Sequence, residues 1–102
     1  MQLQIEKEIV GESLNVTLTG AFDMEAVPAF RKTVEGDVGH WQRVVIDLSD
    51  VDFMDSSGLQ ELVRLQDQAR DLGWEMELAQ PSVAVRRLFE LTGLQTHFTL
   101  RD

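Results

Sequence analysis

Two neighbouring serines, Ser56 and Ser57, are the side chains of this sequence best suited to chemistry. A short β-branched run, Val44–Ile46, precedes them and predicts a central strand that is covered on both faces. The apolar spacing after them predicts a helix over about residues 57–71, and Asp55 is, like the serines, a residue type that begins helices. The two hydroxyls are therefore expected at the amino end of a helix, beside the carboxyl end of a strand. Open α/β sheets place functional groups there, and backbone N–H groups at a helix start can hold a phosphate.

A nucleophilic serine needs a base and a defined turn, and the sequence supplies neither around Ser56. The hydrolase turn reads Gly-x-Ser-x-Gly, but the position two residues before the serine is Met54. The histidines are His40, expected in a loop before the strand, and His97, near the end of the chain, and no motif directs either toward Ser56. No catalytic residue is therefore predicted. A small hydrolase stays open as an alternative, detectable as ester turnover that Ser56→Ala abolishes.

Four aspartates surround the serines at a spacing similar to that of a calcium-binding loop: Asp47, Asp50, Asp52 and Asp55. The central glycine and the terminal glutamate of such a loop are missing, so no metal ligand is predicted. We expect residues 47–54 to form an acidic loop in which Phe53 and Met54 are apolar anchors.

The composition restricts the class of protein and of partner. The 102 residues, 43% of them hydrophobic, are enough for one core, so a single domain over residues 1–102 is expected. The sequence has no cysteine, which excludes disulfides and fits a reducing, cytoplasmic compartment. The formal charge of −9 argues against nucleic acid and anionic membranes as partners, and no apolar run is long enough to cross a bilayer. A glycine-rich phosphate loop and a basic cluster are missing beside Ser56, so no nucleotide or other cofactor is predicted.

The hydrophobic pattern predicts elements in the order β-β-α-β-α-β-α-β. A break at Gly11-Glu12 predicts an antiparallel hairpin, and Asp23 is expected to cap the first helix. Gly73 and Gly93 are expected in the left-handed conformation that ends helices. The fold class is therefore α/β, a mixed sheet of four to five strands in which an N-terminal hairpin is followed by βαβ units, with about three or four helices. The expected strands lie near 3–8, 14–18, 44–46, 75–79 and 98–100, and the expected helices over 24–35, 57–71 and 81–92.

Three separated segments resemble the STAS domain family, and specifically its anti-sigma factor antagonists. Residues 44–65, VVIDLSDVDFMDSSGLQELVRL, resemble the family's signature, and LTGAFD at 18–23 resembles its strand-to-helix turn, usually written LTGELD. PSVAVRRLFELTGL at 81–94 resembles its last helix and turn. The likeness extends over nearly the whole chain and implies the STAS fold. Ala21 and Phe22 depart from the usual glutamate and leucine.

The resemblance also implies a partner-switching function without catalysis. In the antagonist family, the dephosphorylated form binds an anti-sigma factor that is also a serine kinase, and so releases a sigma factor. The kinase uses ATP to phosphorylate the first serine of the DSSG step, which is Ser56 here, with Ser57 as the fallback. A metal-dependent serine phosphatase reverses the step. The partner-binding residues that the family implies are Phe22, Asp23, Met54, Asp55, Ser56 and Ser57.

An alternative within the same family is a scaffold, either a STAS subunit of a lipid-transport ABC complex or a module of a signalling assembly regulated by contact alone. Such subunits more often replace a serine of the DSSG step, so the intact pair disfavours this alternative. A phosphate on Ser56 would add about −1.5 to −2 charges, which a helix amino terminus tolerates. We expect it to block docking by clash, desolvation and repulsion beside Asp52 and Asp55, without refolding the chain.

Overall fold

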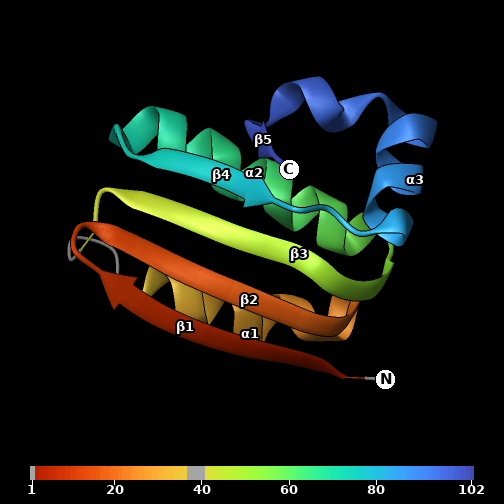
Figure 1. The fold of residues 1–102 in the computed structure, drawn as a ribbon, viewed down its shortest axis with the longest axis horizontal. Helices are drawn as coiled ribbons and strands as arrows, with labels where there is room; N and C mark the ends of the chain where they lie inside the picture. Colours follow the sequence, from red (N-terminus) through yellow and green to blue (C-terminus); the bar gives the residue numbers. More distant parts are fainter. Residues whose placement is uncertain (1, 37–40) are drawn as a thin grey trace.

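The β-sheet is the frame on which the rest of the chain is placed (Figure 1). The computed structural model describes residues 2–36 and 41–102. Within these residues, five strands lie in the order β1-β2-β3-β4-β5, with β1 antiparallel to β2 and every later pair parallel. This confirms the predicted mixed sheet with an N-terminal hairpin. The elements are β1 (Leu3–Val10), β2 (Ser13–Phe22), the 3-10 helix η1 (Met24–Ala26), α1 (Val27–Glu35), β3 (Arg43–Met54), α2 (Ser56–Leu72), β4 (Glu75–Ala79), α3 (Val83–Thr92), the 3-10 helix η2 (Leu94–His97) and β5 (Leu100–Arg101).

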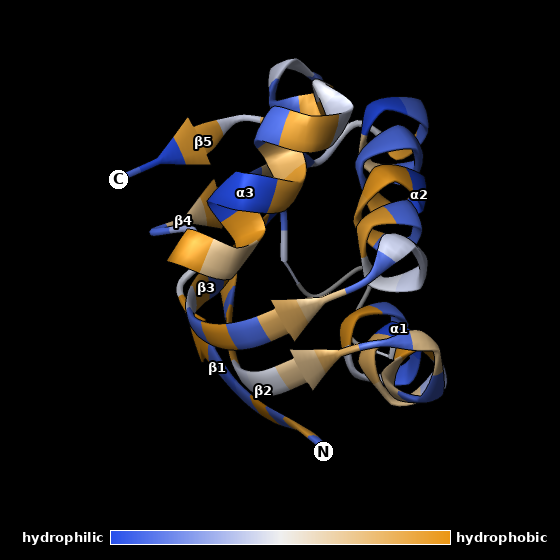
Figure 2. Ribbon diagram, turned by 90° about the vertical axis from the view of Figure 1, so that its right-hand side faces the viewer, coloured by the Kyte–Doolittle hydropathy of each residue, from blue (hydrophilic) through white to orange (hydrophobic). Residues whose placement is uncertain are grey.

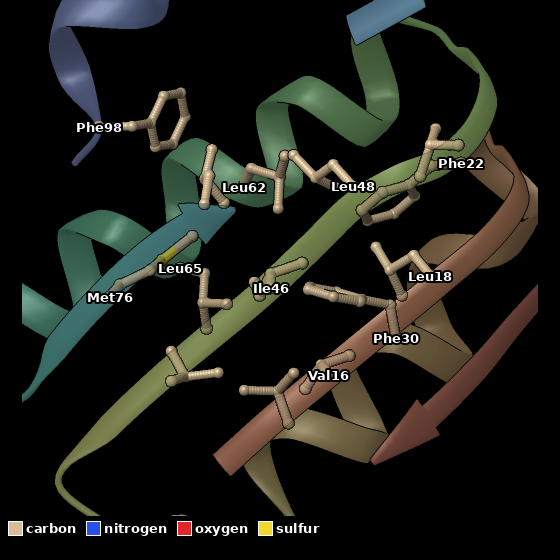
Figure 3. Packing of buried hydrophobic residues seen from close by; sticks show 14 of the residues in the cluster. Val16, Leu18, Phe22, Phe30, Ile46, Leu48, Leu62, Leu65, Met76 and Phe98 are labelled. Carbon is tan, nitrogen blue, oxygen red and sulfur yellow. The ribbon is translucent and has the colours of Figure 1, made fainter. Parts of the chain in front are cut away.

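Helices α1 and α2 cover one face of the sheet, and the opposite face is open (Figures 1 and 2). Side chains along β2 point alternately to the two faces of the sheet, so one face is buried and the other is not. Leu14, Val16 and Leu18 are buried, while Asn15 and Thr17 between them are partly exposed. Figure 3 shows buried side chains of β2 and β3 meeting those of α1 and α2 between the two layers. Helix α3 contacts β3 near the end of that strand, at the edge of the molecule that also holds the start of α2.

Strand β3 is much longer than its sequence pattern predicted. Residues 47–54, expected as a loop, continue the strand, and its pairing with β2 extends until Phe22 lies opposite Met54. The loop prediction is therefore wrong. Register shifts against β2 break the two-residue alternation, so the buried residues of this stretch lie three apart: Leu48, Val51 and Met54. Phe53 was also wrongly assigned as an anchor, because 43% of it is exposed.

The ends of α2 and α3 follow from caps that the sequence carries. Helix α2 extends one residue beyond the predicted 57–71 at each end. Gly73 and Gly93 have φ of 80° and 72°, which confirms both as left-handed helix ends. Ser82 begins α3, and its hydroxyl oxygen accepts a hydrogen bond from the N–H of Val85 at 3.3 Å. Within the described ranges, no helix has both the length and the apolar character that crossing a membrane requires.

The first predicted helix, 24–35, begins as a 3-10 turn rather than as an α-helix. The carboxylate of Asp23 accepts a hydrogen bond from the N–H of Ala26 at 3.1 Å and so caps η1, after which α1 follows with Pro28 in its first turn. The helix η2 was not predicted. His40, which was expected in a loop before the central strand, lies outside the described residues.

Among the described residues, Glu61 of α2 is the one charged residue that is buried, with 3% of its surface exposed. Arg31 of α1 donates to its carboxylate from Nη2 at 2.6 Å and from Nε at 3.2 Å. Arg64 donates to it from Nη2 at 2.7 Å and from Nε at 3.0 Å, and also reaches Glu35 of α1 at 2.8 Å. Burial favours a higher pKa for Glu61, but the hydrogen bonds from Arg64 and Arg31 outweigh it and hold that pKa below its usual value. These four residues join α1 to α2.

Replacing Glu61 by glutamine is expected to lower the free energy of unfolding by about 1–2 kcal/mol at neutral pH, since the carboxylate is lost but both guanidinium groups can turn to water. The pKa of Glu61 is lower in the folded than in the unfolded chain, so its stabilisation is present above the ordinary value of 4.5 and is lost as the pH falls through the folded value. Urea unfolding between about pH 7 and pH 3 should therefore show that the difference in free energy of unfolding between the parent and Glu61→Gln becomes smaller as the pH falls. Glu12→Gln, at an exposed position, is the control. A gap that stays constant to the lowest pH would contradict this assignment.

Candidate functional site

Helix α2 begins at Ser56, and Asp55 immediately before it provides the cap. The Asp55 carboxylate accepts hydrogen bonds from the backbone N–H of Ser57 at 2.9 Å and of Gly58 at 3.1 Å. Neither serine hydroxyl makes a hydrogen bond to any other described residue. Ser56 is exposed and Ser57 partly exposed. Asp55, rather than a serine, therefore caps the helix. The Ser56 hydroxyl lies at the surface and stabilises no part of the described fold through a hydrogen bond.

Gly58 lets the first turn of α2 lie directly against the end of β2. A Cβ atom at this position would stand 2.3 Å from the carbonyl oxygen of Phe22, closer than atoms can approach. The N–H of Asp55 donates to the same carbonyl at 3.4 Å. The turn after β2 and the start of α2 are therefore brought together by backbone contact, and only glycine fits at position 58.

The side chain of Phe22 packs in the core beneath this junction. This side chain is fully buried, at 0% exposure, and lies 4.8 Å from the ring of Phe30, centroid to centroid. The predicted partner contact by the Phe22 side chain is corrected accordingly, because a buried ring cannot touch a partner. Met54, at 7% exposure, is likewise mostly part of the core. Both side chains belong to the packing beneath the site.

Two exposed apolar residues that the sequence reasoning did not assign to the site lie beside it. Met24, directly after Asp23, is 70% exposed, and Phe53 is the other. Their only signal in the sequence was that Met24 directly follows the 18–23 motif and Phe53 lies within the 44–65 motif. We use the name Ser56 surface for the exposed and partly exposed residues of this junction: Asp23, Met24, Phe53, Asp55, Ser56 and Ser57.

The Ser56 surface is negatively charged. Two of its six residues are acidic, Asp23 and Asp55, and none is basic. Asp50 and Asp52, further back in β3, line a pocket together with Arg87 of α3. A docking partner with basic side chains around an apolar centre complements such a surface. Any further negative charge at Ser56 would add to a field that is already negative.

Among the residues that the structure describes, the histidine lies far from Ser56. His97 is hydrogen-bonded through Nε2 to Asp67 Oδ1 at 3.1 Å. Asp67 lies eleven residues further along α2, which is about 16 Å along the helix axis. In residues 2–36 and 41–102, no three acidic or histidine side chains converge in a way that would hold a metal ion. The site as described offers an exposed hydroxyl on an acidic, partly apolar surface.

Comparison with known proteins gives a family and related sequences. A family model described as STAS domain matches residues 4–102. The chain is 31% identical over 96 residues to the anti-sigma F factor antagonist of Paenibacillus polymyxa, an alignment that covers 92% of this chain and 82% of that protein.

Solved structures share the fold. A crystal structure of an anti-sigma factor antagonist from Mycobacterium paratuberculosis matches with a TM-score of 0.80 at 27% identity, covering 98% of this chain and 86% of the other. The unphosphorylated and phosphorylated forms of the Bacillus protein SpoIIAA match with TM-scores of 0.75 and 0.74, both at 22% identity. Each covers 98% of this chain, and the matched parts make up 87% and 91% of those chains.

Substitution of Gly58 by alanine is expected to destabilise the fold by about 1–3 kcal/mol, because the added methyl group meets the Phe22 carbonyl. The sign of this change in stability distinguishes the clash from helix propensity, because propensity alone would make the alanine variant more stable than the parent by about 1 kcal/mol. Urea unfolding followed by circular dichroism measures the difference. Gln60→Ala, at an exposed position of the same helix, should stay within about 0.5 kcal/mol of the parent. A Gly58→Ala chain as stable as the parent would show that the junction is looser than described.

Proposed function

Since this chain belongs to the STAS domain family, we propose that it acts as an anti-sigma factor antagonist. In its unphosphorylated form it binds an anti-sigma factor through the Ser56 surface and thereby releases a sigma factor. The observation that carries this proposal is the exposed Ser56 hydroxyl, left free because Asp55 caps the helix. The relatedness to a named antagonist at 31% identity supports the same function.

The switch is phosphorylation of Ser56 by the anti-sigma factor, acting as a serine kinase. The Ser56 oxygen attacks the γ-phosphorus of ATP, the bond to the departing ADP breaks, and the hydroxyl proton passes to a base of the kinase. A serine phosphatase reverses the step by hydrolysis. This chain supplies the substrate and the binding surface and no catalysis of its own. Ser57 is the fallback acceptor because it is adjacent and partly exposed.

The phosphate is expected to act at the surface and leave the core unchanged. The N–H groups of Ser57 and Gly58 already donate to Asp55, so a phosphate on Ser56 does not displace the cap. The helix terminus tolerates the added charge. A partner that fits the acidic surface must then accommodate a bulky group of about −1.5 to −2 charges, which opposes docking by clash, desolvation and repulsion.

Binding partners and compartment follow from the same proposal. We place the chain in the cytoplasm, where a sigma factor and ATP are both available. The acidic Ser56 surface favours an anti-sigma factor with basic residues at its docking face. Asp23, Met24, Phe53, Asp55 and Ser57 are proposed as contacts around the acceptor, with Phe22 and Met54 holding them from below.

Incubation with an anti-sigma kinase and ATP is expected to place one phosphate on Ser56, as mass spectrometry of the digested chain can establish. Ser56→Ala should remove this phosphate, whereas Ser57→Ala should retain it. A phosphate found on Ser57 in the parent would move the acceptor to the fallback position. The absence of phosphate with every anti-sigma kinase that binds the chain would refute the phosphorylation switch.

Ser56→Asp should fold as the parent does but bind the anti-sigma factor at least about tenfold more weakly, because it places a charge at the centre of the docking surface. Calorimetric titration measures the affinity, and circular dichroism verifies the fold. Gln42→Asp adds the same charge at an exposed position just before β3, at the other end of that strand from the Ser56 surface, and serves as the matched control, with affinity close to that of the parent. Equal affinities for Ser56→Asp and the parent would rule out Ser56 as the centre of the interface.

A further inference from the structure

The Ser56 surface is assembled from two segments whose relative orientation must be fixed for it to have one shape. Asp23 and Met24 belong to the turn and 3-10 helix that lead into α1, whereas Ser56 begins α2. Close to Ser56 the two segments meet where Gly58 lies against Phe22. That contact joins α2 to the end of β2, and α1 itself is held on the sheet by its buried residues Phe30 and Val34.

The hydrogen-bonded ion pairs between α1 and α2 supply two further points. Arg31 of α1 meets Glu61, and Glu35 of α1 meets Arg64. Positions 58, 61 and 64 follow one another at intervals of three residues, which is about 4.5 Å of helix axis per interval. Added to the buried apolar contacts of Phe30 and Val34, the two ion pairs spread along α2 fix the angle between α1 and α2.

A buried carboxylate is an unusual means of joining two helices. Removing Glu61 from water carries a large desolvation cost, and apolar side chains of similar volume often give equal or greater stability at such positions. Apolar packing tolerates sliding and rotation, however, whereas paired N–H donors on a carboxylate impose a direction. Arg31 contacts both oxygens of Glu61, Oε1 at 2.6 Å and Oε2 at 3.2 Å. The pair therefore specifies orientation more than it adds stability.

We propose that Glu61 is a positioning residue of the docking surface: by holding Arg31 and Arg64 it keeps α1 at one angle to α2, so that Met24 and Ser56 are presented to the anti-sigma factor in a single arrangement. The inference rests on the proposed function for the identity of the partner. The orientation of α1 can be measured on the chain alone, so the two claims can fail separately.

Two variants separate orientation from stability. Glu61→Leu removes the carboxylate but leaves no charge buried, because Arg31 and Arg64 have side chains 45% and 36% exposed and can turn to solvent. Its urea midpoint is expected to equal or exceed that of the parent. Arg31→Gln breaks the link between Glu61 and α1, while Glu61 keeps its bonds from Arg64 and Arg64 keeps its bond to Glu35. Arg43→Gln is the control, because it removes ion pairs of an exposed arginine with Glu75 at 2.8 Å and Glu77 at 3.8 Å, both in β4, and none with α1.

The orientation of α1 is tested by spin labels on the chain without any partner. The sequence has no cysteine, so a cysteine pair at the exposed positions Lys32 of α1 and Asp71 of α2 can be labelled cleanly. The distance distribution between the labels should be narrow in the parent and in Arg43→Gln, and broader in both Glu61→Leu and Arg31→Gln. A distribution equally narrow in all four chains overturns the proposal.

The effect on docking is tested by the kinetics of Ser56 phosphorylation. The chemistry belongs to the kinase and Ser56 is intact, so a disturbed docking surface should raise KM by about 10- to 100-fold in Glu61→Leu and Arg31→Gln and leave kcat unchanged. Unchanged KM in both variants overturns the positioning role even if the label distances broaden. Failure of the parent itself to be phosphorylated would count against the proposed function, and the label distances alone would then decide whether Glu61 orients α1.

Discussion

The close approach between the first turn of α2 and the end of β2 is the constraint on which the rest of the site depends. It requires glycine at position 58, because a Cβ atom there would stand 2.3 Å from the Phe22 carbonyl oxygen. The approach brings the turn after β2 beside the start of α2, and so places the segments of two distant sequence motifs on one surface. The buried rings of Phe22 and Phe30 support it from inside the molecule.

A division of tasks between neighbouring residues gives the site its chemical character. Asp55 caps the helix through two backbone N–H groups, which leaves the next residue, Ser56, as an exposed hydroxyl with no structural task. Had the serine been the cap, a phosphate on its oxygen would have removed an acceptor that the helix needs. The arrangement instead lets the surface change its charge while the helix start keeps its hydrogen bonds.

The sequence predicted the fold wherever the hydrophobic period is regular. The alternation of β2, the helical spacing of α2 and the glycines at 73 and 93 were all sufficient. It failed over 47–54 because register shifts between β3 and β2 change the spacing of buried residues, and a shift depends on the neighbouring strand. The same shifts leave Ala21 and Phe22 both buried, so Phe22 was misplaced on the surface. Glu61 could not be singled out at all, because only the approach of α1 reveals that this glutamate is enclosed.

The central claim is that the surface at Ser56 changes without the core responding. Amide NMR spectra of the unphosphorylated and the Ser56-phosphorylated chain test this most directly. The account predicts shift changes confined to residues 22–26 and 53–60, with the amide exchange rates of β2, β3 and β4 unchanged. Shifts spread through the sheet, or loss of exchange protection in those strands, would contradict it and show that the phosphate acts by rearranging the fold.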